Sequence, residues 1–145
     1  MLVRMRPDWP MSTEVGAAMD VFDLSGACAT IREFLEVLTN WYVRRSRPRF
    51  WDGDPAAFGT LHTCLVTVAH LLAPFCPFVA DEIYDNLDGS EHSVHLCEFP
   101  VAGERDHELE SSMAVARETV RLGLAARGQA KLKVRQPLHE AVVVA

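Results

Sequence analysis

The chain has 145 residues, of which 49% are apolar, and its 14 basic and 20 acidic residues give a net charge of −6. This length suits one domain with a substantial core, and the apolar content excludes a disordered tail. No apolar run approaches the length of a membrane span, and residues 1–10 lack the apolar stretch of a secretory signal. We therefore expect a cytoplasmic protein without a membrane partner. Its cysteines form no C-x-x-C pair, which indicates reduced thiols rather than a disulfide or zinc framework (Cys28, Cys64, Cys76 and Cys97).

The first third of the chain predicts two helices. Ser12 is the expected N-cap of a short one, which carries apolar residues at helical spacing as far as Phe22. Asp23 is expected to cap a longer one, which should end near Arg47 because Pro48 disfavours a helical backbone at the preceding residue. One apolar stripe predicts the buried face of this second helix: Ala27, Ile31, Phe34, Leu35, Leu38, Trp41 and Tyr42.

Two more helices are predicted in the middle of the chain. Asp54 and Pro55 suit an N-cap and a first helical position, and this helix should run to about Ala73. Pro77 should start the next helix. The alternation in residues 93–100 (SVHLCEFP) predicts an extended strap across the bundle. The predicted inward residues are Phe58, Leu61, Leu65, Val68 and Leu72 on the first helix, and Phe78, Val79, Ile83 and Leu87 on the second.

The last predicted helix covers about residues 104–128, and the pattern changes after it. Residues 131–135 alternate strictly and three valines follow at 142–144, which are strand signals. The sequence therefore predicts an all-α helical bundle with a short β-prone tail. We expect an N-terminal extension (1–11), the bundle (12–129) and the start of a β-prone segment (130–145). The expected core positions of the last helix are Leu109, Met113, Ala116, Val120 and Leu124.

Residues 40–51 (NWYVRRSRPRFW) contain four arginines, four aromatic residues and no acid. Guanidinium groups pair with phosphates, and aromatic rings stack on unpaired bases, so this composition favours contact with a nucleic acid, and RNA above DNA. The other interpretation places the aromatic rings in a core and leaves the arginines to solvate a helix end. Trp41 and Tyr42 continue the apolar stripe, so Trp51 is the better candidate for base stacking.

A second basic segment follows the last helix. Residues 44–49 and 127–135 together hold eight of the fourteen basic residues, whereas residues 50–104 contain nine acids and no lysine or arginine. In a strand, Lys131, Lys133 and Arg135 would share one face, which suits a phosphate backbone. An edge strand that its lysines protect from aggregation has the same pattern, and the sequence leaves both interpretations open.

No group of residues predicts a catalytic centre. His62, Cys64 and His70 do not have the helical spacing of shared metal ligands, and Asp81, Glu82 and Asp85 suit a solvated helix face. Phosphate-binding loops, nucleophile elbows and H-E-x-x-H motifs are absent from the sequence. We therefore expect neither a metal nor a cofactor.

With these segments in view, the chain resembles the anticodon-binding domain of isoleucyl-tRNA synthetases, which are class I enzymes. NWYVRRSR together with KxKVRQPL distinguishes the isoleucyl branch from the valyl and leucyl branches. The resemblance implies a helical bundle that docks against the anticodon stem and loop of a tRNA, most simply an isoleucine-accepting one. It covers residues 15–144 and rests on MDVFDLSGA (19–27), TNWYVRRSRPRFW (39–51), LLAPFCPFVADEIYDNL (71–87), SVHLCEFP (93–100) and AKLKVRQPL (130–138).

The sequence also departs from the family. The two ATP-binding signatures, His-Ile-Gly-His and Lys-Met-Ser-Lys-Ser, are absent together with the nucleotide fold and the editing domain, residues 1–11 have no match, and Pro48 stands where members have another residue. From this chain alone we expect no catalysis, although the parent family is an ATP-dependent isoleucine–tRNA ligase.

The leading hypothesis is therefore a tRNA-binding module. Asn40 either hydrogen-bonds a base edge or supports packing, and Trp51 is expected to stack on a base. The alternative is a protein-interaction domain that keeps the fold without RNA binding, with its arginines against the catalytic part of a synthetase. The expected phosphate contacts are Arg44, Arg45, Arg47, Arg49, Lys131, Lys133 and Arg135.

Overall fold

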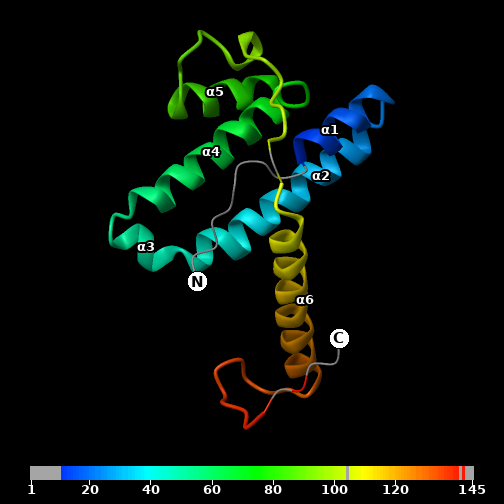
Figure 1. Cartoon of the computed structure of the whole chain (residues 1–145), viewed down its shortest axis with the longest axis vertical. Helices are drawn as coiled ribbons and strands as arrows, with labels where there is room; N and C mark the ends of the chain where they lie inside the picture. Colours follow the sequence, from blue (N-terminus) through cyan, green and yellow to red (C-terminus); the bar gives the residue numbers. More distant parts are fainter. Residues whose placement is uncertain (1–10, 104, 141, 143–145) are drawn as a thin grey trace. The chain divides into compact units, whose positions relative to one another are not determined.

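The computed structural model describes residues 11–103, 105–140 and 142, and the chain divides into two compact units, Met1–Glu104 and Arg105–Ala145 (Figure 1). Every regular element within the described residues is a helix, which confirms the predicted all-α class. The first unit contains α1 (Met11–Asp20), α2 (Leu24–Val37), the π-helix η1 (Leu38–Val43), α3 (Arg47–Trp51), α4 (Pro55–Leu72), α5 (Pro77–Leu87) and the 3-10 helix η2 (Val94–Leu96); the second contains α6 (His107–Gln129).

Two helical hairpins form the first unit. Helix α1 packs on α2, α4 packs on α5, and η1 and α3 lead the chain from the first hairpin to the second (Figure 1). Helix α4 joins the hairpins, since Cys64, Val68 and Leu71 belong to one buried cluster and Ala69 belongs to the other. The first cluster also contains Met11, Val15, Ala27, Ile31, Phe34, Leu38 and Tyr42, and the second contains Ala73, Ala80, Tyr84 and Val94.

The carboxylate caps that the sequence predicts are confirmed. The Gly26 N–H donates to Asp23 at 2.9 Å, and the Ala56 N–H donates to Asp54 at 2.9 Å. Each bond satisfies one of the amide groups that a helix leaves unpaired in its first turn. Pro55 occupies the start of α4 and Pro77 the start of α5, where a missing N–H costs no helical hydrogen bond.

One predicted helix start is wrong, and another helix begins directly after the predicted end near Arg47. In the described residues α1 begins at Met11, so Ser12 lies inside the helix and is buried rather than serving as its N-cap. The chain bends at Ser46 as expected, but Arg47 and Pro48 begin a new five-residue helix, α3. Proline is tolerated in the first turn of a helix, so Pro48 separates two helices instead of ending helical structure.

Several predicted core residues are exposed. Phe22 and Phe78 each have 88% of their surface exposed, and Phe58 and Val79 are also exposed. On α5 the inward face carries the buried Ala80 and Tyr84 together with the predicted Ile83, which packs against the same cluster, whereas Phe78 and Val79 lie off this face. Apolar character alone did not show that the first turn of α5 leaves Phe78 and Val79 in solvent.

The segment after α5 and the C-terminal unit also differ from their predictions. Residues 94–96 of the expected strap form η2, which Asp81 holds by accepting hydrogen bonds from the Ser93 hydroxyl at 2.7 Å and the Val94 N–H at 2.9 Å. None of the residues of α6 is buried, so the core positions predicted for this helix are wrong. The tail residues within the described part, 130–140 and 142, form turns and irregular backbone, and the predicted strand is not seen there.

Helix α4 has the length and mean hydropathy of a membrane-spanning helix, contrary to the expectation from the sequence. The same composition is found in core helices of soluble proteins, so it is weak evidence for a membrane. Here 28% of α4 is buried, and its buried side chains belong to both clusters of the first unit.

Phe22 occupies a position where glycine is usual. The Asp23 N–H bonds to the Ala18 carbonyl at 2.8 Å and the Phe22 N–H to the Met19 carbonyl at 3.0 Å, which is the Schellman pattern of a helix end. This pattern places Phe22 at φ 59°, a left-handed backbone that costs a residue with a Cβ about 1–2 kcal/mol. The cost is not offset by burial, since the ring is exposed.

We therefore predict that Phe22→Gly is more stable than Phe22→Ala. Both variants remove the ring, but only glycine relieves the left-handed strain, and its larger unfolded-state entropy subtracts part of the gain. The expected difference in the free energy of unfolding is about 0.5–1 kcal/mol, measured by urea denaturation. Equal stabilities of the two variants would show that the backbone at position 22 is unstrained.

Candidate nucleic-acid interface

The basic-aromatic segment begins inside a change of helical pitch. Helix α2 passes into the π-helix η1, where the Arg44 N–H reaches the carbonyl of Thr39, five residues earlier. A π-turn holds more than 3.6 residues, so it offsets the side chains that follow around the helix axis. Such turns occur frequently at functional sites. This one lies directly before Arg44 and Arg45.

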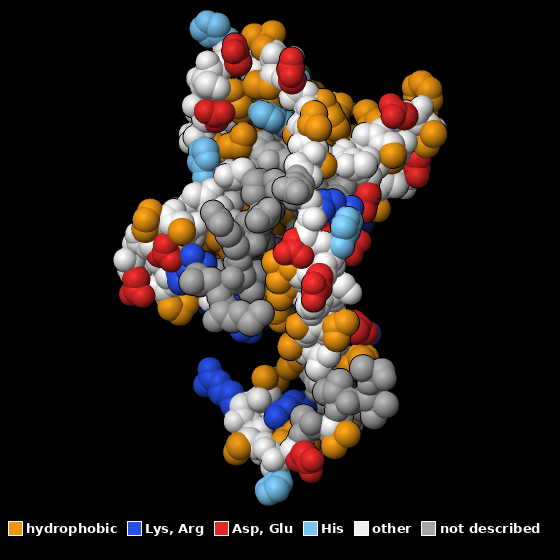
Figure 2. Space-filling view, viewed as in Figure 1, with side chains coloured by type: hydrophobic (Ala, Val, Ile, Leu, Met, Phe, Trp, Pro, Cys, Tyr) orange, Lys and Arg blue, Asp and Glu red, His pale blue; other side chains and the backbone are white. Residues whose placement is uncertain are grey.

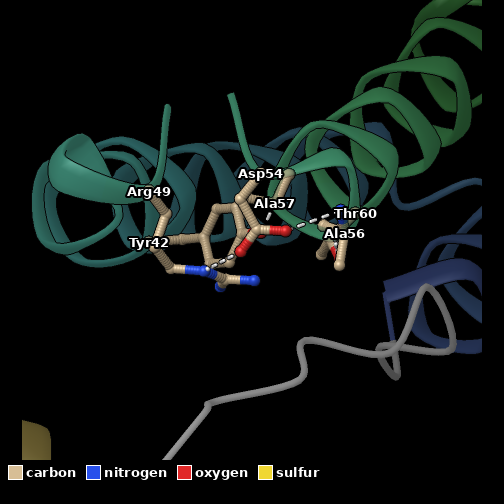
Figure 3. Close-up of polar contacts among 6 residues, drawn as sticks. All are labelled: Tyr42, Arg49, Asp54, Ala56, Ala57 and Thr60. Carbon is tan, nitrogen blue, oxygen red and sulfur yellow. Dashed lines mark hydrogen bonds and ion pairs between the residues drawn. The ribbon is translucent and has the colours of Figure 1, made fainter. Parts of the chain in front are cut away.

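The inward side of the segment is fixed by Tyr42. Its ring is 3% exposed, and its hydroxyl donates to the Ala57 carbonyl of α4 at 3.0 Å (Figure 3). Phe50 packs edge-on against Tyr42, with ring centroids 6.3 Å apart, and against Phe58 at 5.1 Å. Two of the four aromatic residues therefore support packing, as the sequence indicates for Tyr42.

Arg49 is tied to the start of α4. Its Nε lies 2.8 Å from a carboxylate oxygen of Asp54, whose other oxygen accepts from Ala56 as the N-cap (Figure 3). Two hydrogen bonds lower the pKa of Asp54: the one from Arg49 has the larger effect, and the one from the Ala56 N–H has the smaller. The guanidinium is therefore partly committed to a structural pair. The sequence predicts Asp54 as an N-cap but not as the partner of Arg49.

The outward side carries the remaining arginines. Arg44, Arg45 and Arg47 are exposed, and within the described part of the chain none of them forms an ion pair. The Arg45 guanidinium lies 5.0 Å from the centroid of the Trp41 ring, a cation–π distance. Trp51 exposes 88% of its surface. Cations and an exposed ring thus lie within eight residues of one another along the chain.

Asn40 is also exposed, and its side-chain amide has a local partner. The Nδ2 group donates to a carboxylate oxygen of Glu36, one helical turn earlier, at 2.8 Å. A base edge would compete with this carboxylate for the amide N–H, while the amide oxygen remains an acceptor. The contact with Glu36 is therefore compatible with the predicted hydrogen bond from Asn40 to a base edge but does not test it.

The second basic segment lies in the C-terminal unit, after α6. Lys131, Lys133 and Arg135 are exposed, but they lie in turns rather than on one face of a strand. Lys131 has φ 54° and ends α6 with the same Schellman hydrogen bonds as Phe22, in which the Leu132 N–H reaches the Arg127 carbonyl at 2.9 Å. This segment and residues 40–51 belong to different units.

The surface charge follows the sequence pattern. On the face shown in Figure 2, Lys and Arg side chains occur near α3 and around the loop after α6, and acidic side chains occur near α5 and also near α3. A polyanion would be attracted by the Lys and Arg side chains and repelled by the acidic ones near α5.

The described residues offer no metal site, since no three of their His, Cys, Asp and Glu side chains come together. His70 lines a cleft of about 410 Å³ in the first unit. Burial lowers the pKa of His70, and the negative charge of Asp88 raises it by a smaller amount. Burial likewise raises the pKa of the Cys64 thiol to about 11, which makes it a poor nucleophile at neutral pH.

These features define an α-helical module that exposes clustered arginines beside a tryptophan. A family model described as the anticodon-binding domain of tRNA ligase matches residues 11–143, and the chain belongs to this family. An isoleucine–tRNA ligase of Deinococcus radiodurans is 48% identical over 131 residues, which cover 86% of this chain and 12% of that protein.

Two further relatives give the same picture. Isoleucine–tRNA ligases of Dehalococcoides mccartyi and Cutibacterium acnes are 45% and 44% identical, over 143 and 138 residues, and each match covers 90% of this chain. The chain spans 12% to 14% of the length of these three relatives. The resemblance stated from the sequence is confirmed at the level of the family.

The Arg49–Asp54 pair makes a prediction about acid stability. Folding lowers the Asp54 pKa from 3.8, so the carboxylate stabilises the folded chain fully above pH 3.8 and loses this effect as the pH falls through the folded-state pKa. Asp54→Asn keeps an N-cap but removes the charge. We expect a lower melting temperature than wild type at pH 7 and a smaller difference at pH 3.

Asp52→Asn is the control, because it removes an exposed acid from the same turn and leaves the pair intact. Its melting temperature should follow that of wild type at both pH values. The interpretation fails if Asp54→Asn and wild type differ by the same amount at pH 3 as at pH 7.

Proposed function

We propose that this chain binds the anticodon stem and loop of a tRNA, in the manner expected of an isoleucyl-tRNA synthetase module. The observation that carries the proposal is the outward set of Arg44, Arg45 and Arg47 beside the exposed Trp51, in a family defined by anticodon binding. Guanidinium groups bind the phosphates and position the loop, and the indole ring stacks on an unpaired base. Asn40 is proposed as a hydrogen-bonding group to a base edge.

An isoleucine-accepting tRNA is the proposed partner because the matched relatives are isoleucine–tRNA ligases. Such a module would act in the cytoplasm, where translation takes place. Arg49, Lys131, Lys133 and Arg135 are proposed as further phosphate contacts. Arg49 can contribute through its terminal amino groups, because Asp54 occupies its Nε. The β-prone character of residues 130–145 stays a prediction, and it requires a second strand for pairing.

The second candidate function is a protein-interaction domain, and Phe22 is the observation that favours it. Val21 and Phe22 are 73% and 88% exposed, between the acidic residues Asp20 and Asp23. A strained, exposed aromatic residue of this kind suits an apolar surface bordered by basic residues. The catalytic part of a synthetase is the proposed partner in that case.

Replacing Arg44 and Arg45 with alanine should weaken binding of an isoleucine-tRNA transcript. Each lost phosphate contact reduces the log–log dependence of affinity on salt by about 0.7–0.9, so the double variant should be shallower than wild type by about 1.4–1.8. The measurement is fluorescence anisotropy over a salt series. Arg32→Ala removes an exposed arginine from α2 outside the segment and serves as control. Unchanged affinity and slope in the double variant would contradict the proposed site.

Trp51→Ala should lower affinity without changing the salt slope, because stacking releases no counterions. A stacked base contributes about 1–3 kcal/mol, so we expect a loss of about fivefold to 150-fold. Trp51→Phe keeps a ring and should retain more of the affinity than Trp51→Ala. Melting curves should coincide for all three proteins, because the ring is exposed. Equal binding by wild type and Trp51→Ala would exclude stacking on this ring.

A further inference from the structure

Arg127 stands apart from the other cations of the C-terminal unit. It lies in the last turn of α6, and its side chain turns back onto the loop that follows. Its Nη1 group lies 2.9 Å from the Lys133 carbonyl, 2.8 Å from the Gln136 carbonyl and 3.4 Å from the Val134 carbonyl. One guanidinium nitrogen therefore contacts three backbone carbonyl oxygens of the same loop.

The backbone of Arg127 holds the other side of this loop. Its carbonyl accepts from the Leu132 N–H at 2.9 Å, while the Gln136 N–H closes a turn on the Lys133 carbonyl at 3.0 Å. Residues 131–136 are thus anchored near both ends to a single residue of α6. Hydrogen bonds from a charged donor are stronger than those from a neutral one.

The orientation of the carbonyl groups has an electrostatic consequence. Carbonyl oxygens carry partial negative charge and would repel a phosphate if they faced it. The three oxygens of Lys133, Val134 and Gln136 are directed to the Arg127 guanidinium instead. The side chains of Lys131, Lys133 and Arg135 remain exposed. The loop therefore presents cations outward and directs its oxygens inward.

From this geometry we infer that Arg127 is the positioning residue of the second phosphate-binding segment. The inference rests on the proposed tRNA-binding function. Arg127 does not itself contact RNA; it orders the loop in which Lys131, Lys133 and Arg135 lie. Ordering the loop before binding reduces the conformational entropy lost when the cations meet the phosphates. The segment acts as a closed loop, and the unpaired strand expected from the alternating sequence is not needed.

The test compares Arg127→Ala and Arg127→Lys with Arg121→Ala in the full chain. Lysine keeps the charge, but its side chain is one bond shorter, so its ammonium group cannot reach the position from which Nη1 contacts the three carbonyls. Arg121 is a matched control, because it is an exposed arginine of the same helix whose ion pair is with Glu118. Two readouts are used: trypsin cleavage after residues 131, 133 and 135, followed by mass spectrometry, and binding of an isoleucine-tRNA transcript.

We expect both Arg127 variants to be cleaved in the loop at least fivefold faster than wild type and to bind tRNA about tenfold more weakly. Arg121→Ala should match wild type in cleavage. Two results overturn the inference: unchanged cleavage in both Arg127 variants, or faster cleavage with unchanged affinity. If Arg127→Lys binds as well as wild type while Arg127→Ala does not, Arg127 is a direct phosphate contact, and the inference is again wrong.

Failure of the proposed function gives a different result. In that case wild type and Arg121→Ala do not bind tRNA even at low salt. The proposed function and the positioning role of Arg127 are then both wrong. In the two results that overturn only the positioning role, wild type still binds tRNA. Faster loop cleavage in the Arg127 variants would then show only that the hydrogen bonds order the backbone.

Discussion

The hydrogen bond from Tyr42 to Ala57 determines how the first unit presents its basic surface. It connects the end of the first hairpin with the beginning of the second, over a separation of fifteen residues. The Ala57 carbonyl has a second lone pair, so it can accept from the phenol within a helix. Loss of the hydroxyl would remove this one hydrogen bond, whose net contribution to the free energy of unfolding is about 0.5–1.5 kcal/mol. With Tyr42 fixed inward, Arg44 and Arg45 lie on the exposed part of the same helical segment.

Some basic residues of this protein hold the fold together and others are exposed to a ligand, and the position of a residue in the sequence does not show which it does. Arg49 secures α3 to the N-terminus of α4, and Arg127 gathers the backbone of the loop after α6. Arg44 and Arg47 are exposed and form no ion pair within the described residues. A count of basic residues therefore overstates the number of charges available to a polyanion. The distinction depends on which acceptors lie within reach, and only the fold shows that.

Local signals in the sequence predicted the helices better than their faces. Asp23, Asp54 and Pro77 mark helix starts through bonds or geometry confined to a single turn, so a short stretch of sequence is enough to identify them. Burial is a property of the whole unit. Phe78 and Tyr84 are both aromatic residues of α5, yet only Tyr84 faces the second cluster. The predicted Ile83 packs on the same cluster as Tyr84, but the apolar character of Phe78 does not reveal that it lies off this face.

The candidate site shows the same limit. The composition of residues 40–51 identified the segment, and the apolar stripe correctly assigned Tyr42 to the core. The partners of Arg49 and Arg127 were not predicted, because one depends on the turn before α4 and the other on a loop that reverses onto its own helix. Strict alternation in residues 131–135 suggested a strand, but bonds to Arg127 give the backbone a more local way to satisfy its carbonyl groups.

Helix α6 depends on itself to an unusual extent. Asp106 caps its start, ion pairs join Arg105 to Glu110 and Glu118 to Arg121, and the loop after it closes on Arg127, while none of its side chains is buried. Its stability therefore comes from contacts within a few residues of each other. Because none of its residues is buried, the amino-acid sequence of α6 is constrained mainly at its cap, its ion pairs and Arg127, and its other exposed positions are free to vary as far as the helix itself is concerned.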